Sequence, residues 1–262
     1  MKFSIITVVK NDKFNIERTI KSVINQNFQN FEYILINGLS NDGTTEIIKK
    51  YVKKRKIISI NQKDKNLFDA INKGIKIARG KYVFLLHSGD FFSSANTLSF
   101  FDKKVKKFDI VSSNIQIYRN KSIIRNWNYG AVNKLKSDLF KLAHISLFIK
   151  RKLISNRNYY DVNYSIASDT DFIFRLFRKD IDYKHYNYLS VFMKADGLSA
   201  RKSLVLKKIY QDLIIYYKNY NYLFLYYYIK KIFYKIIKLI LQKKLDNKFL
   251  KKELSKLERL RY

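Results

Sequence analysis

The 262-residue chain contains no cysteine, no proline and only three histidines. Without cysteine it cannot form a disulfide scaffold, a thiolate zinc site or a thiol nucleophile. Three histidines also argue against a histidine-rich metal site, because such a site needs several imidazole ligands. These absences exclude thiol-based structure and thiol catalysis.

Long hydrophobic runs are also missing. Residues 3–9 follow Lys2 as in a secretory signal, but this apolar stretch is seven residues long and no small-residue cleavage site follows it. The longest uncharged run near the C-terminus, residues 219–229, has eleven residues, whereas a membrane-spanning helix needs about 20. The sequence therefore predicts neither a targeting signal nor a spanning helix.

Acidic residues are scarce, with 21 Asp and Glu against 53 Lys and Arg, which gives a net charge of +32. An excess of this size indicates an anionic partner, whether nucleic acid, a phosphorylated small molecule or a membrane surface. Hydrophobic residues make up 47% of the chain, so a substantial core can form and global disorder is excluded. The length suits one large domain with an appendage, or two small domains.

The first half of the chain alternates short β-branched runs with segments of helical periodicity. The runs predicted as strands are residues 3–9, 31–36, 57–60 and 82–86, and those predicted as helices are about 15–27, 44–55 and 68–78. This alternation predicts an α/β fold with a parallel sheet and helices on both faces. The loops that follow the strands, 10–12, 37–43, 61–67 and 87–91, should then converge at one edge.

These loops contain neither a GxGxxG motif nor a P-loop. They contain instead Asn41-Asp42-Gly43 and the run His87-Ser88-Gly89-Asp90. A carboxylate among oxygen donors at a strand end can hold a hard divalent cation that bridges two phosphates. Asp42 is better interpreted as a cap of the helix that begins at Thr44. For Asp90 the two interpretations, metal ligand or simple strand end, stay open on these grounds alone.

Six ordered motifs extend this pattern over roughly residues 3–200. They are SIITVVKN (4–11), ERTIKSV (17–23) with Gln26, FEYILING (31–38), SNDGT (40–44), DAINKGI (69–75) and SGD (88–90). Together they resemble the family 2 glycosyltransferases of GT-A fold. The resemblance implies a Rossmann-like, mostly parallel sheet flanked by helices over residues 1–200, with a basic, tyrosine-rich helical extension over 201–262.

The resemblance also implies a reaction and the residues that perform it. The enzyme would move a hexosyl or N-acetylhexosaminyl group, with inversion, from a nucleoside-diphosphate sugar to a glycan or lipid-linked acceptor in cell-surface polysaccharide or lipopolysaccharide synthesis. Asp90 would bind Mn²⁺ or Mg²⁺, and Asp169 would be the general base. The residues that match the family's donor-binding positions are Thr7, Val8, Asn37, Gly38, Asp69, Ser88 and Gly89. His144 matches an acceptor-side histidine, although a semi-buried structural histidine explains it equally well.

The assignment of the base has a chemical reason. An acceptor hydroxyl is a poor nucleophile at neutral pH, so a carboxylate has to take its proton as the new bond forms. Asp171 lies two residues beyond Asp169 and should point elsewhere on the helix. We interpret it as a first-turn carboxylate that favours the helix dipole.

Two departures from the family pattern keep other functions open. Asn37 replaces a usual Asp, and Gly89 stands where a second acidic residue is common. A catalytically silent relative that serves as a partner subunit is one alternative. A basic nucleic-acid-binding protein is another, although no known module is visible and acidic loops repel phosphate without a cation, so no nucleic-acid partner is predicted.

Residues 201–262 contain 17 Lys and Arg against 4 Asp and Glu, a net charge of +13. Apolar residues recur there at helical spacing, at Ile229, Ile232, Phe233, Ile236, Ile237 and Ile240, and eight tyrosines are interspersed between 216 and 234. One hypothesis is an interfacial helix on an anionic bilayer, which would place a cytoplasmic enzyme on the inner face of the membrane. The alternative is a helical hairpin that packs its apolar stripe on the catalytic domain.

Overall fold

The computed structural model describes residues 1–53, 57–120, 122–128, 136–154, 159–178, 180–195, 197, 202–234 and 236–237. The chain divides into two compact units, Met1–Asp212 and Leu213–Tyr262. The predicted domain boundary at residue 200 stays a prediction. Residue 240 and the rest of the extension beyond it lie outside the described residues.

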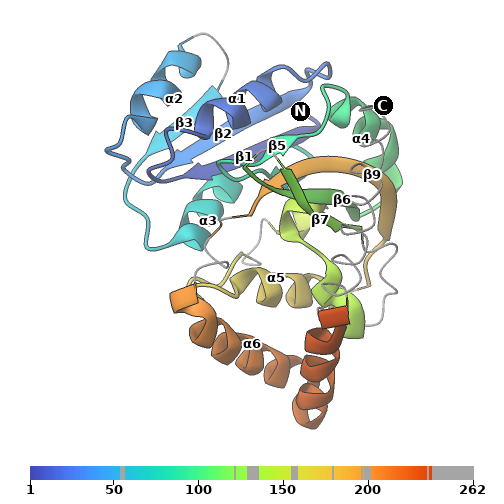
Figure 1. The fold of residues 1–262 in the computed structure, drawn as a ribbon. Helices are drawn as coiled ribbons and strands as arrows, with labels where there is room; N and C mark the ends of the chain where they lie inside the picture. Colours follow the sequence, from blue (N-terminus) through green and yellow to red (C-terminus); the bar gives the residue numbers. More distant parts are fainter. Residues whose placement is uncertain are drawn as a thin grey trace, which may run out of the picture. The chain divides into compact units, whose positions relative to one another are not determined.

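The first unit begins with the predicted parallel strands. These are β1 (Phe3–Val9), β2 (Phe31–Asn37), β3 (Ile57–Asn61) and β4 (Tyr82–Leu85), in the order β3-β2-β1-β4 (Figure 1). All seven residues of β1 are buried, because the strand is central and covered on both faces. Its register places Ile6 opposite Ile34 of β2 and Leu85 of β4.

Helices cover both faces of these strands, as the alternation predicted. The helices are α1 (Ile16–Ile24), α2 (Thr44–Val52) and α3 (Leu67–Ile77). Ile5 belongs to a core cluster with residues of α1 and α2, whereas its neighbour Ile6 faces α3. The approach of α3 requires a glycine, because a Cβ at Gly74 would lie 2.5 Å from Cγ2 of Ile6. Successive side chains of β1 thus enter two separate layers of core.

The second half of the first unit makes the sheet mixed. It adds β5 (Phe91–Phe92), α4 (Thr97–Lys104), β6 (Ile110–Arg119), β7 (Ser122–Trp127), β8 (Leu147–Lys150), α5 (Ser168–Leu176) and β9 (Tyr183–Lys194). The sheet order is β3-β2-β1-β4-β8-β6-β9-β5, and β7 pairs with β6. Strand β8 is antiparallel to β4 and β6, while β9 is parallel to β6 and antiparallel to β5. The pairing of β9 with β5 brings Lys194 next to the loop that follows β4.

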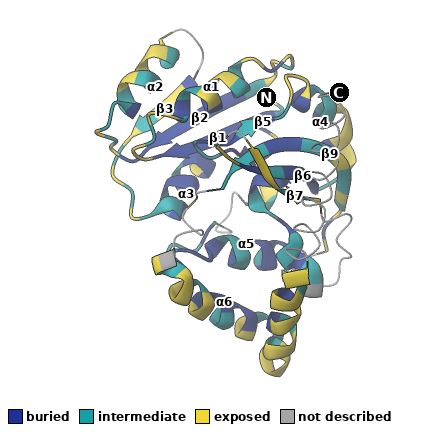
Figure 2. Ribbon diagram, in the orientation of Figure 1, coloured by how far each residue is buried: buried dark blue, intermediate teal, exposed yellow. Residues whose placement is uncertain are grey.

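Aromatic packing holds the two halves of the sheet together. The ring of Phe148 on β8 lies 4.3 Å from Phe84 of β4, 4.3 Å from Phe101 of α4 and 5.4 Å from Phe3 of β1, measured between ring centroids. All four side chains are fully buried, and the buried residues follow the strands in Figure 2. Burying one such ring stabilises the fold by about 1.5–3 kcal/mol, so this junction is a rigid base for the loops above it.

The described residues of the second unit, 213–234 and 236–237, are helical, as predicted for the extension. α6 (Val205–Tyr220) enters this unit, and the 3-10 turn Asn221–Leu223 leads to helical residues 224–234. The ring of Tyr216 lies 5.4 Å from that of Tyr228, and the ammonium of Lys231 lies 5.0 Å above Tyr216. The apolar stripe on the second segment is exposed, with Ile229 at 60% and Phe233 at 64%. None of the described helices has both the length and the apolar character that crossing a bilayer requires.

Candidate functional site

The loops at the carboxyl ends of the parallel strands converge, as predicted. The backbone N–H of Asn11 donates to Oγ of Ser40 at 2.8 Å, and the N–H of Asn41 donates to Oδ1 of Asn11 at 3.0 Å. Ser88 in the loop after β4 donates from Oγ to Oδ2 of Asp12 at 2.7 Å. Loops from three strands are therefore tied to one another by direct hydrogen bonds.

Asn37 closes the loop after β2. Its Nδ2 donates to Oγ1 of Thr45 at 2.8 Å, and its Oδ1 accepts from Oγ of Ser40 at 2.6 Å. The Thr45 hydroxyl already donates to the Ser40 carbonyl at 3.0 Å, so its lone pair faces residue 37. An amide meets that lone pair with a donor, whereas a carboxylate has none. The loop geometry thus explains asparagine where the family usually has aspartate.

Asp42 has the capping role that its position predicted. Its Oδ1 accepts from the backbone N–H of Thr44 at 3.0 Å and from the Thr44 hydroxyl at 2.6 Å. The side-chain hydrogen bond from Thr44 lowers the pKa of Asp42. Its Oδ2 accepts from the backbone N–H of Lys13 at 3.1 Å, so this carboxylate holds the start of α2 and ties it to the loop before α1.

The loop after β4 is held on both sides. The Thr19 hydroxyl of α1 donates to the Asp90 carbonyl at 2.7 Å and accepts from the Gly89 N–H at 3.0 Å. The Tyr118 hydroxyl of β6 donates to the Gly89 carbonyl at 2.6 Å. Arg18 lies between Phe91 and Tyr118, with its guanidinium 4.1 Å and 4.6 Å from the two ring centroids. The Asp90 backbone is thereby fixed before any ligand arrives.

Asp90 itself is 4% exposed. Its Oδ1 accepts the backbone N–H of Lys194 at 2.8 Å, while Oδ2 accepts no hydrogen bond from the described residues. Burial, together with the nearby charge of Asp12, raises the pKa of Asp90 to about 7. A buried carboxylate with an unused oxygen beside a second carboxylate is well suited to a hard divalent cation.

Asp12 is the residue of this site that the motifs did not single out. It lies in the loop that follows β1, one of the loops expected to converge, and this position was the available signal. No cluster of three His, Cys, Asp or Glu that could hold a metal occurs within the described ranges. Asp90 and Asp12 nevertheless fit an ion such as Mg²⁺, which proteins commonly bind through one or two carboxylates and substrate phosphates.

Asp169 lies in the first turn of α5 and is half-buried. The negative charge of Asp169 works against the burial that lowers the pKa of His87 and of His144, and it adds to the burial that raises the pKa of Tyr160, so these groups are its neighbours. The ring of Tyr160 stacks on Phe172, three residues beyond Asp169 on α5, at 4.0 Å. His87 belongs to the loop of Asp90, whose backbone N–H donates to the His87 carbonyl at 3.0 Å. The two predicted aspartates thus adjoin one loop.

Hydrogen bonds connect the predicted acceptor-side His144 to this loop. Its Nε2 lies 3.2 Å from Nε2 of His87, and its Nδ1 lies 3.1 Å from the Tyr160 hydroxyl. Burial lowers the pKa of His87 to about 3 and also lowers that of His144, which favours the neutral form of both rings. Nδ1 of His87 is buried without a partner among the described residues. Burying an unpaired lone pair costs less free energy than burying an unpaired N–H, so Nδ1 of His87 carries no proton. Nε2 of His87 then donates to Nε2 of His144, and Nδ1 of His144 donates to the Tyr160 hydroxyl.

Asp171 lies elsewhere on α5, and its Oδ2 pairs with Nε of Arg175 at 2.7 Å. Asp69, in the first turn of α3, accepts from the Lys65 N–H at 2.9 Å and pairs with Lys73 at 3.1 Å. Thr7 is fully buried and its hydroxyl accepts from Tyr33 at 3.1 Å, so this side chain lies inside the sheet layer and outside the loop cluster.

Two further predicted donor residues are positioned by their backbones. Val8 accepts the N–H of Ser88 at 3.3 Å, and Gly38 donates to the Val9 carbonyl at 2.9 Å. A Cβ at Gly38 would lie 3.0 Å from Oδ2 of Asp64. Donor contacts by the predicted residues, Thr7, Val8, Asn37, Gly38, Asp69, Ser88 and Gly89, stay predictions.

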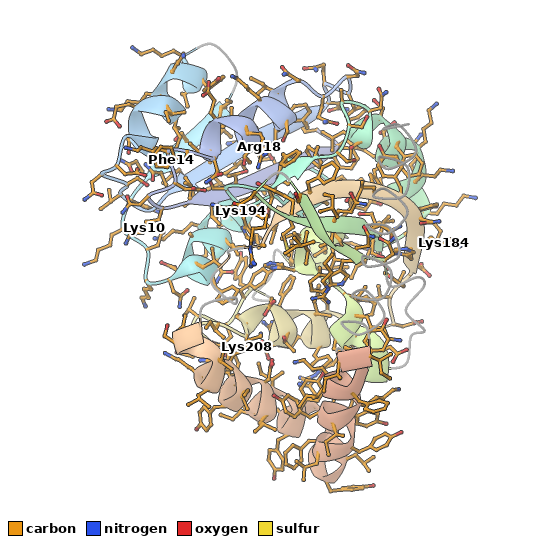
Figure 3. The ribbon with its side chains drawn as sticks, in the orientation of Figure 1. Lys10, Phe14, Arg18, Lys184, Lys194 and Lys208 are labelled. Atoms are coloured by element: carbon orange, nitrogen blue, oxygen red, sulfur yellow. The ribbon has the colours of Figure 1, made fainter. Side chains whose placement is uncertain are left out.

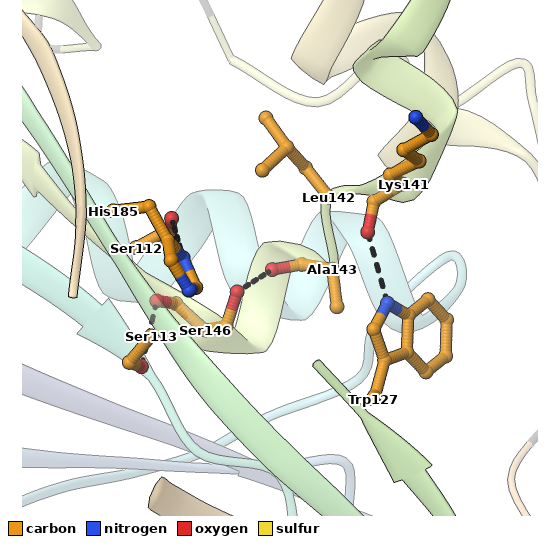
Figure 4. A pocket seen from close by; sticks show the side chains of 8 residues that line it. All are labelled: Ser112, Ser113, Trp127, Lys141, Leu142, Ala143, Ser146 and His185. Carbon is orange, nitrogen blue, oxygen red and sulfur yellow. Dashed lines mark hydrogen bonds between the residues drawn. The ribbon is translucent and has the colours of Figure 1, made fainter. Parts of the chain in front are cut away.

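A small pocket lies beside the segment that bears His144 (Figure 4). It is lined by Ser112, Ser113, Trp127, Lys141, Leu142, Ala143, Ser146 and His185. Most of its polar groups bond one another: Trp127 donates to the Lys141 carbonyl at 2.9 Å and Ser146 to that of Ala143 at 2.8 Å. None of the predicted site residues lines this pocket. The hydrogen bonds between its lining residues hold the backbone of the segment before His144 in place.

The mixed sheet, the strand-end loop cluster and the flanking helices together define a glycosyltransferase of GT-A fold. Residues 4–186 match the Glycosyl transferase family 2, and the chain therefore belongs to this family and is a glycosyltransferase. This confirms the resemblance drawn from the six motifs.

Curated relatives agree with this assignment. A "PGL/p-HBAD biosynthesis glycosyltransferase" of Mycobacterium tuberculosis is 28% identical over 182 residues, which cover 67% of this chain and 69% of that protein. The "Cholesterol galactosyltransferase" of Borreliella burgdorferi is 27% identical over 79% of this chain and 64% of its own length.

Solved structures share the fold. The structure of S. aureus TarS 1–349 in complex with UDP-GlcNAc has a TM-score of 0.70 and 18% identity, covering 82% of this chain and 66% of that one. The mannosyltransferase PcManGT from Pyrobaculum calidifontis, in complex with GDP-Man and Mn²⁺, has a TM-score of 0.62 and 12% identity, covering 83% of this chain. The present chain spans 64% of another structure of S. aureus TarS 1–349.

Proposed function

We propose that the protein is an inverting glycosyltransferase that moves a sugar from a nucleoside-diphosphate donor to a glycan or lipid-linked acceptor in cell-surface glycan synthesis. The observation that carries the proposal is the loop after β4. Asp90 belongs to this loop, and its His87 is linked through His144 and Tyr160 to α5, the helix that bears Asp169. One carboxylate is thus available for the donor side and another for the acceptor side of a single site.

The chemistry divides between these two carboxylates. Asp169 accepts the proton of the acceptor hydroxyl as the bond to the anomeric carbon forms, which inverts that carbon in a single displacement. Asp90, with Asp12 beside it, would hold a divalent cation, Mn²⁺ or Mg²⁺. When bound, this cation stabilises the negative charge that develops on the leaving diphosphate.

The comparisons support the substrate classes. The fold neighbours were solved with UDP-GlcNAc and with GDP-Man, so a nucleotide sugar is the proposed donor. One relative is a cholesterol galactosyltransferase, and for this chain we extend the acceptor class to a lipid-linked or glycan acceptor.

A panel of UDP-, GDP-, CDP- and dTDP-sugars tests the proposed reaction. With Mn²⁺ or Mg²⁺ we expect transfer or slow hydrolysis of at least one sugar, and the released anomer should be inverted relative to the donor. If the protein turns over none of these sugars but still binds a nucleoside diphosphate, it is instead a catalytically silent relative.

We also propose that the extension binds an anionic membrane surface, where a lipid-linked acceptor would be found. Ile229, Ile232 and Phe233 are 60%, 42% and 64% exposed on the second helical segment. A net charge of +13 over residues 201–262 complements anionic headgroups, and each Lys or Arg near such a surface contributes about 1 kcal/mol. Tyrosine rings suit the headgroup boundary.

Replacing Ile229 and Phe233 with serine in the full chain should weaken binding to phosphatidylglycerol-containing vesicles at least about tenfold, because two apolar side chains no longer insert. Sedimentation with and without phosphatidylglycerol measures this. Ile123→Ser/Ile124→Ser is the matched control, since both residues are exposed on β7, outside the extension. Equal binding by all three proteins would contradict membrane docking by the extension. Deletion from residue 201 is unsuitable, because Gln211 accepts the N–H groups of Ile166 and Ala167 before α5.

A further inference from the structure

Gly89 occupies a position where a second acidic residue is common in the family, and the structure shows what fills the space. Gly89 has a φ of +94°, and a Cβ there would lie 2.9 Å from Cδ and 3.3 Å from Cβ of Lys194. Any side chain at residue 89 would therefore collide with the Lys194 side chain, besides adopting a strained backbone conformation. The missing carboxylate is replaced by the stem of a lysine.

The backbone of Lys194 is fixed against this loop. Lys194 is the last residue of β9, paired with Tyr118 of β6 in the sheet register. Its N–H donates to Oδ1 of Asp90 at 2.8 Å. β9 also pairs with β5, where Phe192 lies opposite Phe91. The lysine is thus positioned by three neighbouring segments and does not depend on a flexible loop.

The ammonium group remains available to a ligand. Nζ lies 3.9 Å from Oδ1 of Asp12, which is an ion-pair distance too long for a hydrogen bond. The Lys194 side chain is 34% exposed. Within the described part of the chain, Nζ donates no hydrogen bond, so its three donors are open. By contrast, the guanidinium of Arg18 donates to the Tyr118 hydroxyl and is stacked between two rings.

We propose that Lys194 binds the diphosphate of the nucleotide-sugar donor and shares the charge neutralisation with the divalent cation. The inference rests on the proposed nucleoside-diphosphate donor. The Lys194 ammonium lies beside the carboxylates that we propose to hold the cation, Asp90 and Asp12. A diphosphate bound by that cation would therefore lie near the ammonium, and lysine is a common phosphate ligand. Because the Lys194 ammonium supplies one positive charge, we expect the nucleotide to bind even when no metal is present.

Calorimetric titration of the full chain with UDP and with GDP, in EDTA and in Mn²⁺, tests this. In EDTA we expect the wild type to bind one of them and Lys194→Met to bind it about 10- to 100-fold more weakly, the effect of one charge-assisted hydrogen bond. In Mn²⁺ the loss should be smaller, since the metal supplies part of the charge. Methionine keeps an unbranched stem over Gly89, and Lys194→Arg should restore most of the affinity.

Lys184→Met is the matched control, because Lys184 is exposed at the opposite end of β9 (Figure 3). Equal affinities of wild type, Lys194→Met and Lys184→Met in EDTA would overturn the role of Lys194. Binding by the wild type in Mn²⁺ but not in EDTA would overturn it as well. Binding of neither nucleotide in either condition would overturn the role of Lys194 toward UDP or GDP and would exclude these two as the donor nucleotide. Circular dichroism would show whether each variant is folded.

Discussion

Replacing Asp169 with asparagine is expected to lower kcat by about 10²–10⁴-fold, the usual contribution of a general base. Asparagine keeps the oxygen that accepts the Thr170 N–H at 2.9 Å, so the start of α5 should be preserved. The variant cannot take a proton from the acceptor hydroxyl. Donor affinity should stay within about twofold of the wild type, because the base acts on the acceptor.

Single-turnover transfer and nucleotide titration together measure this effect. Asp171→Asn is the matched control, since it removes a carboxylate two residues away that pairs with Arg175. We expect this control to cost about 1 kcal/mol of stability and to change kcat by no more than about threefold. Full activity in Asp169→Asn would exclude Asp169 as the base, and a larger loss in Asp171→Asn would transfer the role to that residue.

Local sequence patterns were enough to predict the region around the proposed cation site. Continuous apolar runs identified β1 to β4, and parallel strands require their carboxyl-end loops to meet at one edge. Hence the neighbourhood of Asn37, Ser88 and Asp90 followed from spacing alone. Asp12 lay in the same set of loops but belongs to no motif that would have marked it.

The other contacts of the candidate site could not be predicted, because they depend on strand pairings that no local sequence pattern encodes. Lys194 reaches Asp90 across 104 residues, through the register of β9 on β5 and β6. His87 contacts His144 in a similar way, across 57 residues. Gly89 illustrates the difference: the sequence shows only that an acidic residue is missing, while the fold shows a lysine in its place.

Replacing Asp90 with asparagine is expected to remove Mn²⁺-dependent enhancement of nucleotide binding and to lower kcat/KM at least about 100-fold, because the leaving diphosphate loses its cation. Asparagine can still accept the Lys194 N–H, so the loop geometry is retained. Binding in EDTA should change little. Asp102→Asn, which removes a partly exposed carboxylate paired with Lys2, is the matched control.

The same substitution should stabilise the metal-free protein at neutral and alkaline pH. Burial raises the pKa of Asp90 from 3.8 to about 7, so the unfolded chain releases this proton at lower pH than the folded chain. Stability of the wild type in EDTA should therefore fall between about pH 4 and pH 7, by about 2–4 kcal/mol relative to the asparagine variant. Urea unfolding at pH 5 and pH 8 measures the difference, which Mn²⁺ should reduce in the wild type alone. A pH-independent difference between the two proteins would mean that Asp90 is not a buried, titrating carboxylate, and the cation site would lose its main physical support.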